Sequence, residues 1–260
     1  MNQSAPAELL DRICMIAREA GEVIMPYFES DDLITHRKSD RSQVTGADRA
    51  AETLIIGALS RLTPGTPIVA EEAVEAGHVP EVAGKNFWLV DPLDGTKEFI
   101  QRIPEFTVNI ALVENGQPVL GVVYAPASNL LYAGTVPGGA FVEEHGERRS
   151  ISARRVDPDG ITVALSRTYG SGVELDRFLQ HYRVTKQVLA GSSIKFCLVA
   201  RGEADVYPRY GGSMEWDTAA GHAVVSAAGG SVREIEDGPP LVYGKPGFRN
   251  PNFIVWGRTD

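Results

Sequence analysis

Apolar residues recur at helical spacing in two long stretches near the start of the chain. Over residues 7–28, the apolar positions from Leu9 to Ile24 are three or four residues apart, which predicts an amphipathic helix. Residues 47–62 repeat this pattern until Pro64 and Gly65 end it. We therefore expect two long helices at the start of the fold.

Short apolar runs, typical of strands, follow these helices. Residues 67–70 and 86–90 predict two strands, the first ending at Glu71-Glu72 and the second at Asp91. From residue 106 to 151, apolar runs alternate with turn signals such as Asn115-Gly116 and His145-Gly146. This alternation predicts an antiparallel meander.

Strands and helices alternate through the last hundred or so residues. The pattern predicts strands over 161–165, 184–189 and 204–207, helices over 173–181, 194–200 and 218–228, and two closing strands. No repeat, low-complexity tract or flexible linker interrupts the chain. We expect two packed lobes, residues 1–155 and 156–260, that share one cleft.

The length of 260 residues and the hydrophobic content of 43% allow a sizeable core. No window approaches the roughly 20 apolar residues of a membrane span, and the N-terminus lacks a signal-peptide pattern, so we expect a cytoplasmic protein. Peripheral membrane association stays open, although no basic amphipathic stretch suggests it. Cys14 and Cys197 lie far apart in apolar helical patterns, which predicts reduced, buried thiols.

The formal net charge of −9 argues against a nucleic-acid polymer as the ligand, because such binding depends on Lys and Arg that neutralise phosphates. Surface acids of a soluble protein account for most of this charge. An acidic site that holds divalent cations would account for some of it, and the cations would attract a phosphorylated small molecule. The total charge does not decide between these explanations.

Four acidic residues stand at the ends of predicted strands or beside a predicted helix: Glu71, Asp91, Asp94 and Asp217. Each alone has a structural explanation as a solvated loop acid, a turn former or a helix cap. Together, a strand that ends in Asp, a stiff Pro92 and a second Asp can aim two carboxylates at one point. These four residues offer only oxygen ligands, and no His or Cys residues stand at the spacing of a zinc site, since the five histidines are scattered singly. Such a ligand set favours Mg²⁺ over Zn²⁺.

Gly95 and Thr96 follow Asp94 directly. A glycine turn that opens a helix offers backbone N–H groups and a hydroxyl to the oxygens of a phosphate. A phosphate site would then adjoin the cation site. This adjacency is what metal-assisted phosphoester hydrolysis requires.

Three separated motifs resemble the signatures of the inositol monophosphatase superfamily in order and spacing. They are Glu71-Glu72, the segment from Asp91 to Thr96, and the segment from Trp216 to Gly221. The resemblance implies a two-lobed α+β fold, a layered α/β/α/β/α sandwich of the inositol monophosphatase and fructose-1,6-bisphosphatase type. It places the active site between the lobes.

Further segments resemble the CysQ-type 3'(2'),5'-bisphosphate nucleotidases within this superfamily: residues 97–100, 191–197 and 204–209. This resemblance implies removal of the 3'-phosphate from adenosine 3',5'-bisphosphate, a by-product of sulfate activation, to give AMP and phosphate, with inhibition by lithium. Whether the sulfated nucleotide is a second substrate stays open. The alternatives are an inositol monophosphatase or fructose-1,6-bisphosphatase on the same metal core, and a non-catalytic phosphate-binding protein, which would predict a damaged ligand set.

Carried over residue by residue, the resemblance implies two or three Mg²⁺ ions. Asp91 would bridge two of them, and Asp48 and Thr96 would orient or deprotonate the attacking water, with Glu71 also in a catalytic role. The implied ligands are Glu71, Asp91, Asp94, Asp217 and the backbone carbonyl of Leu93.

The resemblance also implies contacts to the substrate. Gly95 and Thr96 would hold the scissile phosphate, and Ser192, Lys195 and Arg209 the other phosphate or the base. Lys195 could instead be a solvated helix residue and Arg209 a strand-edge charge.

Two positions and the assembly leave alternatives open. Tyr169 stands where many relatives carry histidine, which puts the nucleotide preference in doubt. Glu98 is either a helix-start acid or a neighbour of the metal site. Dimers are common among relatives, so a homodimer stays open.

Overall fold

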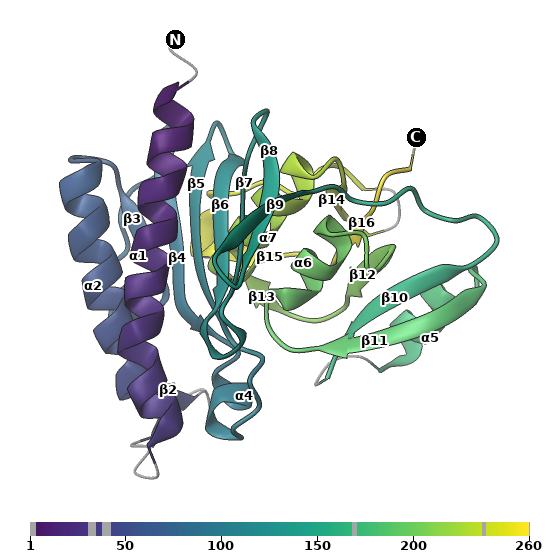
Figure 1. The fold of residues 1–260 in the computed structure, drawn as a ribbon, viewed down its shortest axis with the longest axis horizontal. Coiled ribbons are helices and arrows are strands. Elements are labelled where there is room, and N and C mark those ends of the chain that lie inside the picture. Colours follow the sequence, from purple (N-terminus) through teal and green to yellow (C-terminus); the bar gives the residue numbers. More distant parts are fainter. Residues whose placement is uncertain (1–3, 31–34, 38–42, 168–170, 236–237, 260) are drawn as a thin grey trace.

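A computed structural model describes residues 4–30, 35–37, 43–167, 171–235 and 238–259. Helices and sheets alternate across the molecule in stacked layers (Figure 1). The helices α1 and α2 cover one face of a seven-stranded sheet, α6 and α7 lie between this sheet and a five-stranded sheet, and α5 lies on the far side. This order of layers is the one predicted from the sequence.

The two predicted N-terminal helices are confirmed as α1 (Ser4–Glu29) and α2 (Gly46–Leu62). They pack against each other and against the seven-stranded sheet. Ile13 and Ile24 of α1, Ile55 of α2 and Trp88 of the sheet are fully buried in one apolar cluster. The apolar stripes of both helices therefore face the sheet, as their spacing predicts.

The seven-stranded sheet has the order β3-β4-β5-β6-β7-β8-β9. β3 pairs parallel with β4, and every later neighbour is antiparallel, so the predicted meander is confirmed. The strands are β3 (Ile68–Ala70), β4 (Phe87–Asp94), β5 (Thr107–Glu114), β6 (Gln117–Ala125), β7 (Leu130–Thr135), β8 (Gly139–Glu144) and β9 (Glu147–Ile151).

The ends of the first two strands differ in part from the sequence prediction. β4 does not end at Asp91 but continues to Asp94, with an irregular register where Asp91 faces Asn109 and Asp94 faces Thr107. The extra residue forms a bulge, and Pro92, which has no N–H to donate, lies within it. Glu71 does not lie in a loop, because it begins the short helix α3 (Glu71–Glu75).

The five-stranded sheet has the order β11-β10-β12-β16-β14, with β10 parallel to β11 and β12. Its strands are β10 (Ile161–Ser166), β11 (Val184–Ala190), β12 (Val206–Arg209), β14 (Ser231–Glu234) and β16 (Phe253–Trp256). The helices of this half are α5 (Val173–Leu179), α6 (Ile194–Ala200) and α7 (Glu215–Ala227), with α7 beginning before the predicted residue 218. Short elements complete the fold: β1 (Thr35–Arg37), β2 (Gln43–Thr45), α4 (Thr96–Ile100), η1 (Pro126–Ser128), β13 (Ser213–Met214), η2 (Pro246–Phe248) and β15 (Arg249–Asn250).

The largest apolar cluster joins the two sheets through α6 and α7. It contains Leu89 and Val123 of the seven-stranded sheet, Phe196 of α6, Trp216 of α7 and Phe253 of the five-stranded sheet. The two halves of the chain therefore share one core. The division into lobes at residue 155 stays a prediction.

The described part of the chain contains no helix that is long and apolar enough to span a membrane. Cys14 and Cys197 are buried and unpaired, as the sequence predicts, and burial raises the pKa of both thiols. His222 is buried against the Tyr243 hydroxyl, whereas His78, His145 and His181 are exposed.

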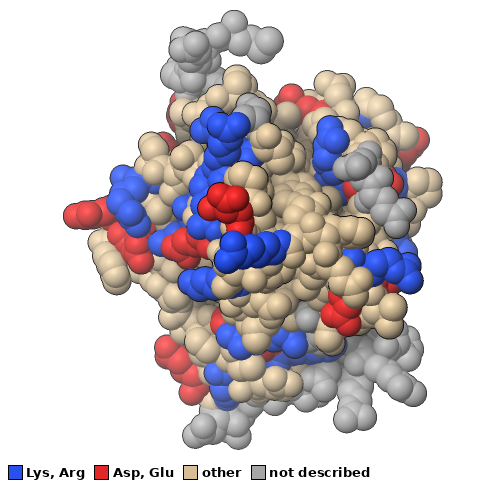
Figure 2. Space-filling view, turned by 90° about the vertical axis from the view of Figure 1, so that its right-hand side faces the viewer, with Lys and Arg blue, Asp and Glu red and all other residues tan. Residues whose placement is uncertain are grey.

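On the face of the five-stranded sheet, basic and acidic side chains are intermixed (Figure 2).

Candidate active site

A cavity of about 540 Å³ lies where the two halves of the chain meet. Asp91 and Leu93 are buried in β4, with only 1% and 0% of their surfaces exposed, and do not line it. The other predicted site residues all line it: Asp48, Glu71, Asp94, Gly95, Thr96, Ser192, Lys195, Arg209 and Asp217.

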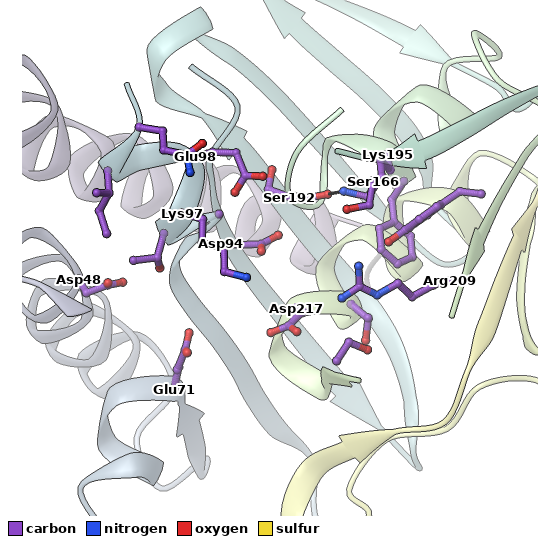
Figure 3. Close-up of a pocket in the computed structure, with 18 of the residues that line it drawn as sticks. Asp48, Glu71, Asp94, Lys97, Glu98, Ser166, Ser192, Lys195, Arg209 and Asp217 are labelled. Atoms are coloured by element: carbon purple, nitrogen blue, oxygen red, sulfur yellow. Dashed lines mark hydrogen bonds between the residues drawn. The ribbon is translucent and has the colours of Figure 1, made fainter. Parts of the chain in front are cut away.

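The labelled acids at one side of this cavity face two basic residues at the other, and Lys97 lies on the side of the acids, near Asp94 (Figure 3). Asp48 and Glu71 lie on one side, Lys195 and Arg209 on the other, and Asp94 and Asp217 lie between them (Figure 3). The arrangement can hold cations near one wall and an anionic group near the other.

The turn after β4 brings backbone and hydroxyl groups to the cavity wall. Gly95 has a φ of 94°, in the left-handed region that favours glycine, and α4 begins at the next residue. A β-carbon at Gly95 would come within 3.0 Å of the Glu105 carbonyl oxygen. The Thr96 hydroxyl donates to the Leu93 carbonyl at 3.2 Å, and Asp91 accepts the Leu93 N–H at 3.0 Å. The motif therefore folds back on itself around the buried end of β4.

Asp94 is held by two polar residues that sequence analysis missed. Its Oδ2 lies 3.0 Å from the Ser193 hydroxyl and 3.4 Å from the Asn109 amide. Ser193 Oγ also lies 2.8 Å from the Asp217 carbonyl oxygen, so it joins two predicted metal-site residues. The available signals were an Asn inside the apolar run of β5 and a serine next to Ser192.

Asp217 has the capping role that its position suggested as an alternative. Its Oδ2 accepts the backbone N–H of Met214 at 2.9 Å, at the start of α7. The same side chain lines the cavity. The helix cap thus holds the carboxylate in place at the site.

The acidic groups repel one another in a poorly solvated place. Burial raises the pKa of Asp91 well above its usual value, and the charges of Glu71, Asp94 and Asp217 raise it further. Burial and the Asp94 charge raise the pKa of Asp217 to about 7. Bound cations would relieve both effects, because an opposite charge favours the ionised carboxylate.

The oxygen-only donors of this cluster fit a hard divalent ion such as Mg²⁺. In the ranges that the structure describes, no group of three Asp, Glu, His or Cys side chains is already arranged to hold a metal ion. The donor chemistry therefore fits, and the carboxylates must turn toward one another to surround an ion.

Neither Lys195 nor Arg209 has the purely structural role that the sequence left open as an alternative. Only 3% of Lys195 is exposed, and its ammonium donates to the carbonyl oxygens of Ala190 and Ser192 and lies 5.3 Å from the Tyr207 ring centre. Burial lowers the pKa of Lys195 to about 8. Arg209 ends β12, which lies inside the sheet between β10 and β16, so it is no strand-edge charge.

Glu98 also lines the cavity, and burial raises its pKa, so it is a neighbour of the site as well as an acid of the first turn of α4. Tyr169 lies outside the described residues.

Proteins with a similar sequence or a similar fold are known. The 3'(2'),5'-bisphosphate nucleotidase CysQ of Escherichia coli (strain K12) is 46% identical over 95% of this chain and 99% of its own. The crystal structure of CysQ from Bacteroides thetaiotaomicron, a member of the inositol monophosphatase family, is 36% identical, with a TM-score of 0.79 over 96% of this chain and 98% of that one. An inositol monophosphatase from Anabaena is 25% identical, with a TM-score of 0.76 over 97% and 92%.

The model of the inositol monophosphatase family matches residues 6–258, nearly the whole chain. These matches confirm the layered sandwich that the motifs implied. The chain belongs to the inositol monophosphatase family.

Proposed function

We propose that this protein is a divalent-metal-dependent 3'(2'),5'-bisphosphate nucleotidase, which removes the 3'-phosphate from adenosine 3',5'-bisphosphate to give AMP and phosphate. The observation that carries the proposal is the cavity with carboxylates at one side and Lys195 and Arg209 at the other. A substrate with a phosphate at each end would meet cations at the first side and basic groups at the second.

The relatives favour this reading over an inositol monophosphatase. The 46% identity to a nucleotidase extends over 251 residues, whereas the inositol monophosphatase from Anabaena is 25% identical. The complete set of predicted acids argues against a non-catalytic protein, because a binding protein has no need to keep them all.

Two or three Mg²⁺ ions would be held by Glu71, Asp91, Asp94, Asp217 and the Leu93 carbonyl. Such ions neutralise phosphoryl oxygens and lower the pKa of water. The Gly95 N–H and the Thr96 hydroxyl would orient the scissile phosphate, because both residues line the cavity. Asp48 and Thr96 would align the attacking water, with Asp48 accepting its proton.

Ser192, Lys195 and Arg209 would recognise the remote phosphate or the base. Lys195 supplies a positive charge at neutral pH, and the Ser192 hydroxyl oxygen is buried with no hydrogen-bond partner among the described residues. A buried hydroxyl without a partner gains most from a ligand that hydrogen-bonds to it.

The test is phosphate release with Mg²⁺ from adenosine 3',5'-bisphosphate, inositol 1-phosphate and fructose 1,6-bisphosphate, compared as kcat/KM. We expect a preference for the nucleotide of about a hundredfold or more, because lost contacts to buried polar groups discriminate strongly. A higher kcat/KM for the inositol or sugar ester would reject the nucleotidase proposal and leave the metal site in place.

A further inference from the structure

Glu105 links the two halves of the chain beside the cavity. It lies in the loop between α4 and β5, and its carboxylate accepts two hydrogen bonds from the Arg167 guanidinium, both at 2.6 Å. The same carboxylate accepts the Gly191 backbone N–H at 2.7 Å. The hydrogen bonds from Arg167 lower the pKa of Glu105, so the carboxylate is ionised at neutral pH.

Both partners of Glu105 adjoin residues that line the cavity. Arg167 follows Ser166, and Gly191 precedes Ser192. The backbone of Glu105 also fills the space between the two glycines, because its carbonyl oxygen is 3.0 Å from a β-carbon position at Gly95 and 2.6 Å from one at Gly191. The Ser192 side chain itself lies 3.3 Å from the same β-carbon position at Gly95, so Glu105 packs beside the contact between the Gly95 turn and Ser192.

Ser192 has an unusual backbone conformation. Its φ is 44°, in the left-handed region that non-glycine residues rarely adopt. Such a conformation persists where the surroundings hold it in place. Glu105 accepts the backbone N–H of Gly191, the residue before Ser192, and Lys195 donates to the carbonyl oxygen of Ser192.

We propose that Glu105, oriented by Arg167, is a positioning residue that holds Ser192 in its left-handed conformation against the Gly95 turn. By placing Ser192 it determines the selectivity for a nucleotide with a second phosphate over a simple phosphate ester. The inference rests on the proposed function, because it concerns the part of the substrate that reaches Ser192 and Lys195. A bidentate Arg–carboxylate pair suits the role, since it fixes the orientation of both side chains.

The variants Glu105→Ala, Glu105→Gln and Arg167→Ala test the role. For each, kcat and KM are measured with adenosine 3',5'-bisphosphate and with p-nitrophenyl phosphate, which has no second phosphate. Arg149→Ala is the control, because it removes an ion pair with Glu144 at 3.0 Å on the hairpin of β8 and β9, away from the cavity. Thermal unfolding of all variants verifies that they fold.

For Glu105→Ala we expect kcat/KM for the nucleotide to fall about tenfold or more, chiefly through KM, because a displacement of about 1 Å in substrate-positioning groups can cost as much. The aryl ester should change less than about threefold. Glu105→Gln keeps an acceptor for Gly191 and should recover most of the selectivity, and Arg167→Ala should lie between the two. Arg149→Ala should behave as the wild type.

Equal losses for both esters, or a fall in the unfolding temperature with unchanged selectivity, would overturn the positioning role and leave Glu105 as a structural residue. If Glu105→Ala does not fold, Arg167→Ala decides by the same criterion, since the Arg167 side chain is 40% exposed and tolerates truncation. A wild-type enzyme without preference for the nucleotide would reject the proposed function itself, whereas preference retained in the folded variants would reject only the role of Glu105.

Discussion

At the scale of single residues, the Asp94 carboxylate interacts with side chains from distant parts of the sequence. Ser193 and Asn109 hold one of its oxygens, and its charge raises the pKa of both Asp91 and Asp217. Asp94→Asn keeps the shape of the side chain and removes one of the repelling charges. We expect kcat to fall at least about a hundredfold because a charged ligand and its electrostatic contribution are lost. The unfolding temperature without Mg²⁺ should not fall.

The matched control for Asp94→Asn is Asp176→Asn, at an exposed position of α5 away from the cavity. It should leave kcat within about twofold of the wild type. Ordinary turnover by Asp94→Asn, measured under the same conditions, would reject the metal assignment.

Lys195 gives the site a pH dependence that follows from its burial. Its pKa is lowered to about 8, so the side chain is cationic below this pH and neutral above it. The pH dependence of kcat/KM reports the pKa values of groups in the free enzyme. Because Lys195 loses its charge near pH 8, kcat/KM for adenosine 3',5'-bisphosphate should fall above this pH. Because Arg stays charged to far higher pH, Lys195→Arg should move this fall upward.

The pH profile with p-nitrophenyl phosphate is the comparison for this prediction. It should lack the fall near pH 8, since the ester has no second phosphate for Lys195 to bind. If kcat/KM fell near pH 8 with both esters, another group would be titrating and Lys195 would not bind the remote phosphate.

At the scale of elements, α7 depends on close contact with the sheet on one face and with α6 on the other. A β-carbon at Gly121 in β6 would stand 2.4 Å from the Ala220 carbonyl oxygen, and one at Gly221 would stand 2.5 Å from the Phe196 ring. Only glycines allow these backbones to approach so closely. The position of α7 in turn sets where Asp217 stands relative to Asp94.

Gly121→Ala should therefore lower the free energy of unfolding by about 1–3 kcal/mol, because α7 must move away from β6. It should also lower kcat, since Asp217 moves with the helix. Urea unfolding followed by circular dichroism measures the first effect. Gly57→Ala is the control: the nearest atom to its β-carbon would be Arg61 Nη1 at 3.6 Å, so in the interior of α2 it should stabilise the protein by about 0.5–1 kcal/mol. Equal stability of Gly121→Ala and the wild type would contradict this account of the packing.

At the scale of the whole molecule, the acidic cluster draws on both halves of the chain. Glu71 and Asp94 come from the region of the seven-stranded sheet, and Asp217 comes from α7 beyond β12. Ions that bind only the folded state stabilise it by mass action, by about 2.7 kcal/mol at one hundred times Kd. For a chain of this size we expect the unfolding temperature to rise by roughly 5–10 °C with saturating Mg²⁺.

Differential scanning calorimetry with and without Mg²⁺ measures this shift. Asp217→Asn should reduce it, since it removes a charge that only the second half of the chain supplies. An unchanged unfolding temperature at saturating Mg²⁺ would count against a site between the halves.

Features governed by neighbouring residues could be predicted from the sequence alone. The helical spacing of 47–62 and the turn at Asn115-Gly116 agree with the structure because periodicity and turn chemistry act over a few residues. The three motifs likewise identified the family, since their order along the chain is a property of the sequence.

What only the tertiary structure decided depends on distant segments meeting. Two hydrogen bonds join parts of the chain that no local pattern connects: that of Ser193 to Asp94 and that of Gly191 to Glu105. The burial of Lys195 likewise depends on distant segments. The extension of β4 past Asp91 was missed for the same reason, because its pairing with β5 outweighs the local effect of Pro92. Local chemistry thus determined which residues are available for the site, and the packing of the two sheets around α6 and α7 decided which of them face one another.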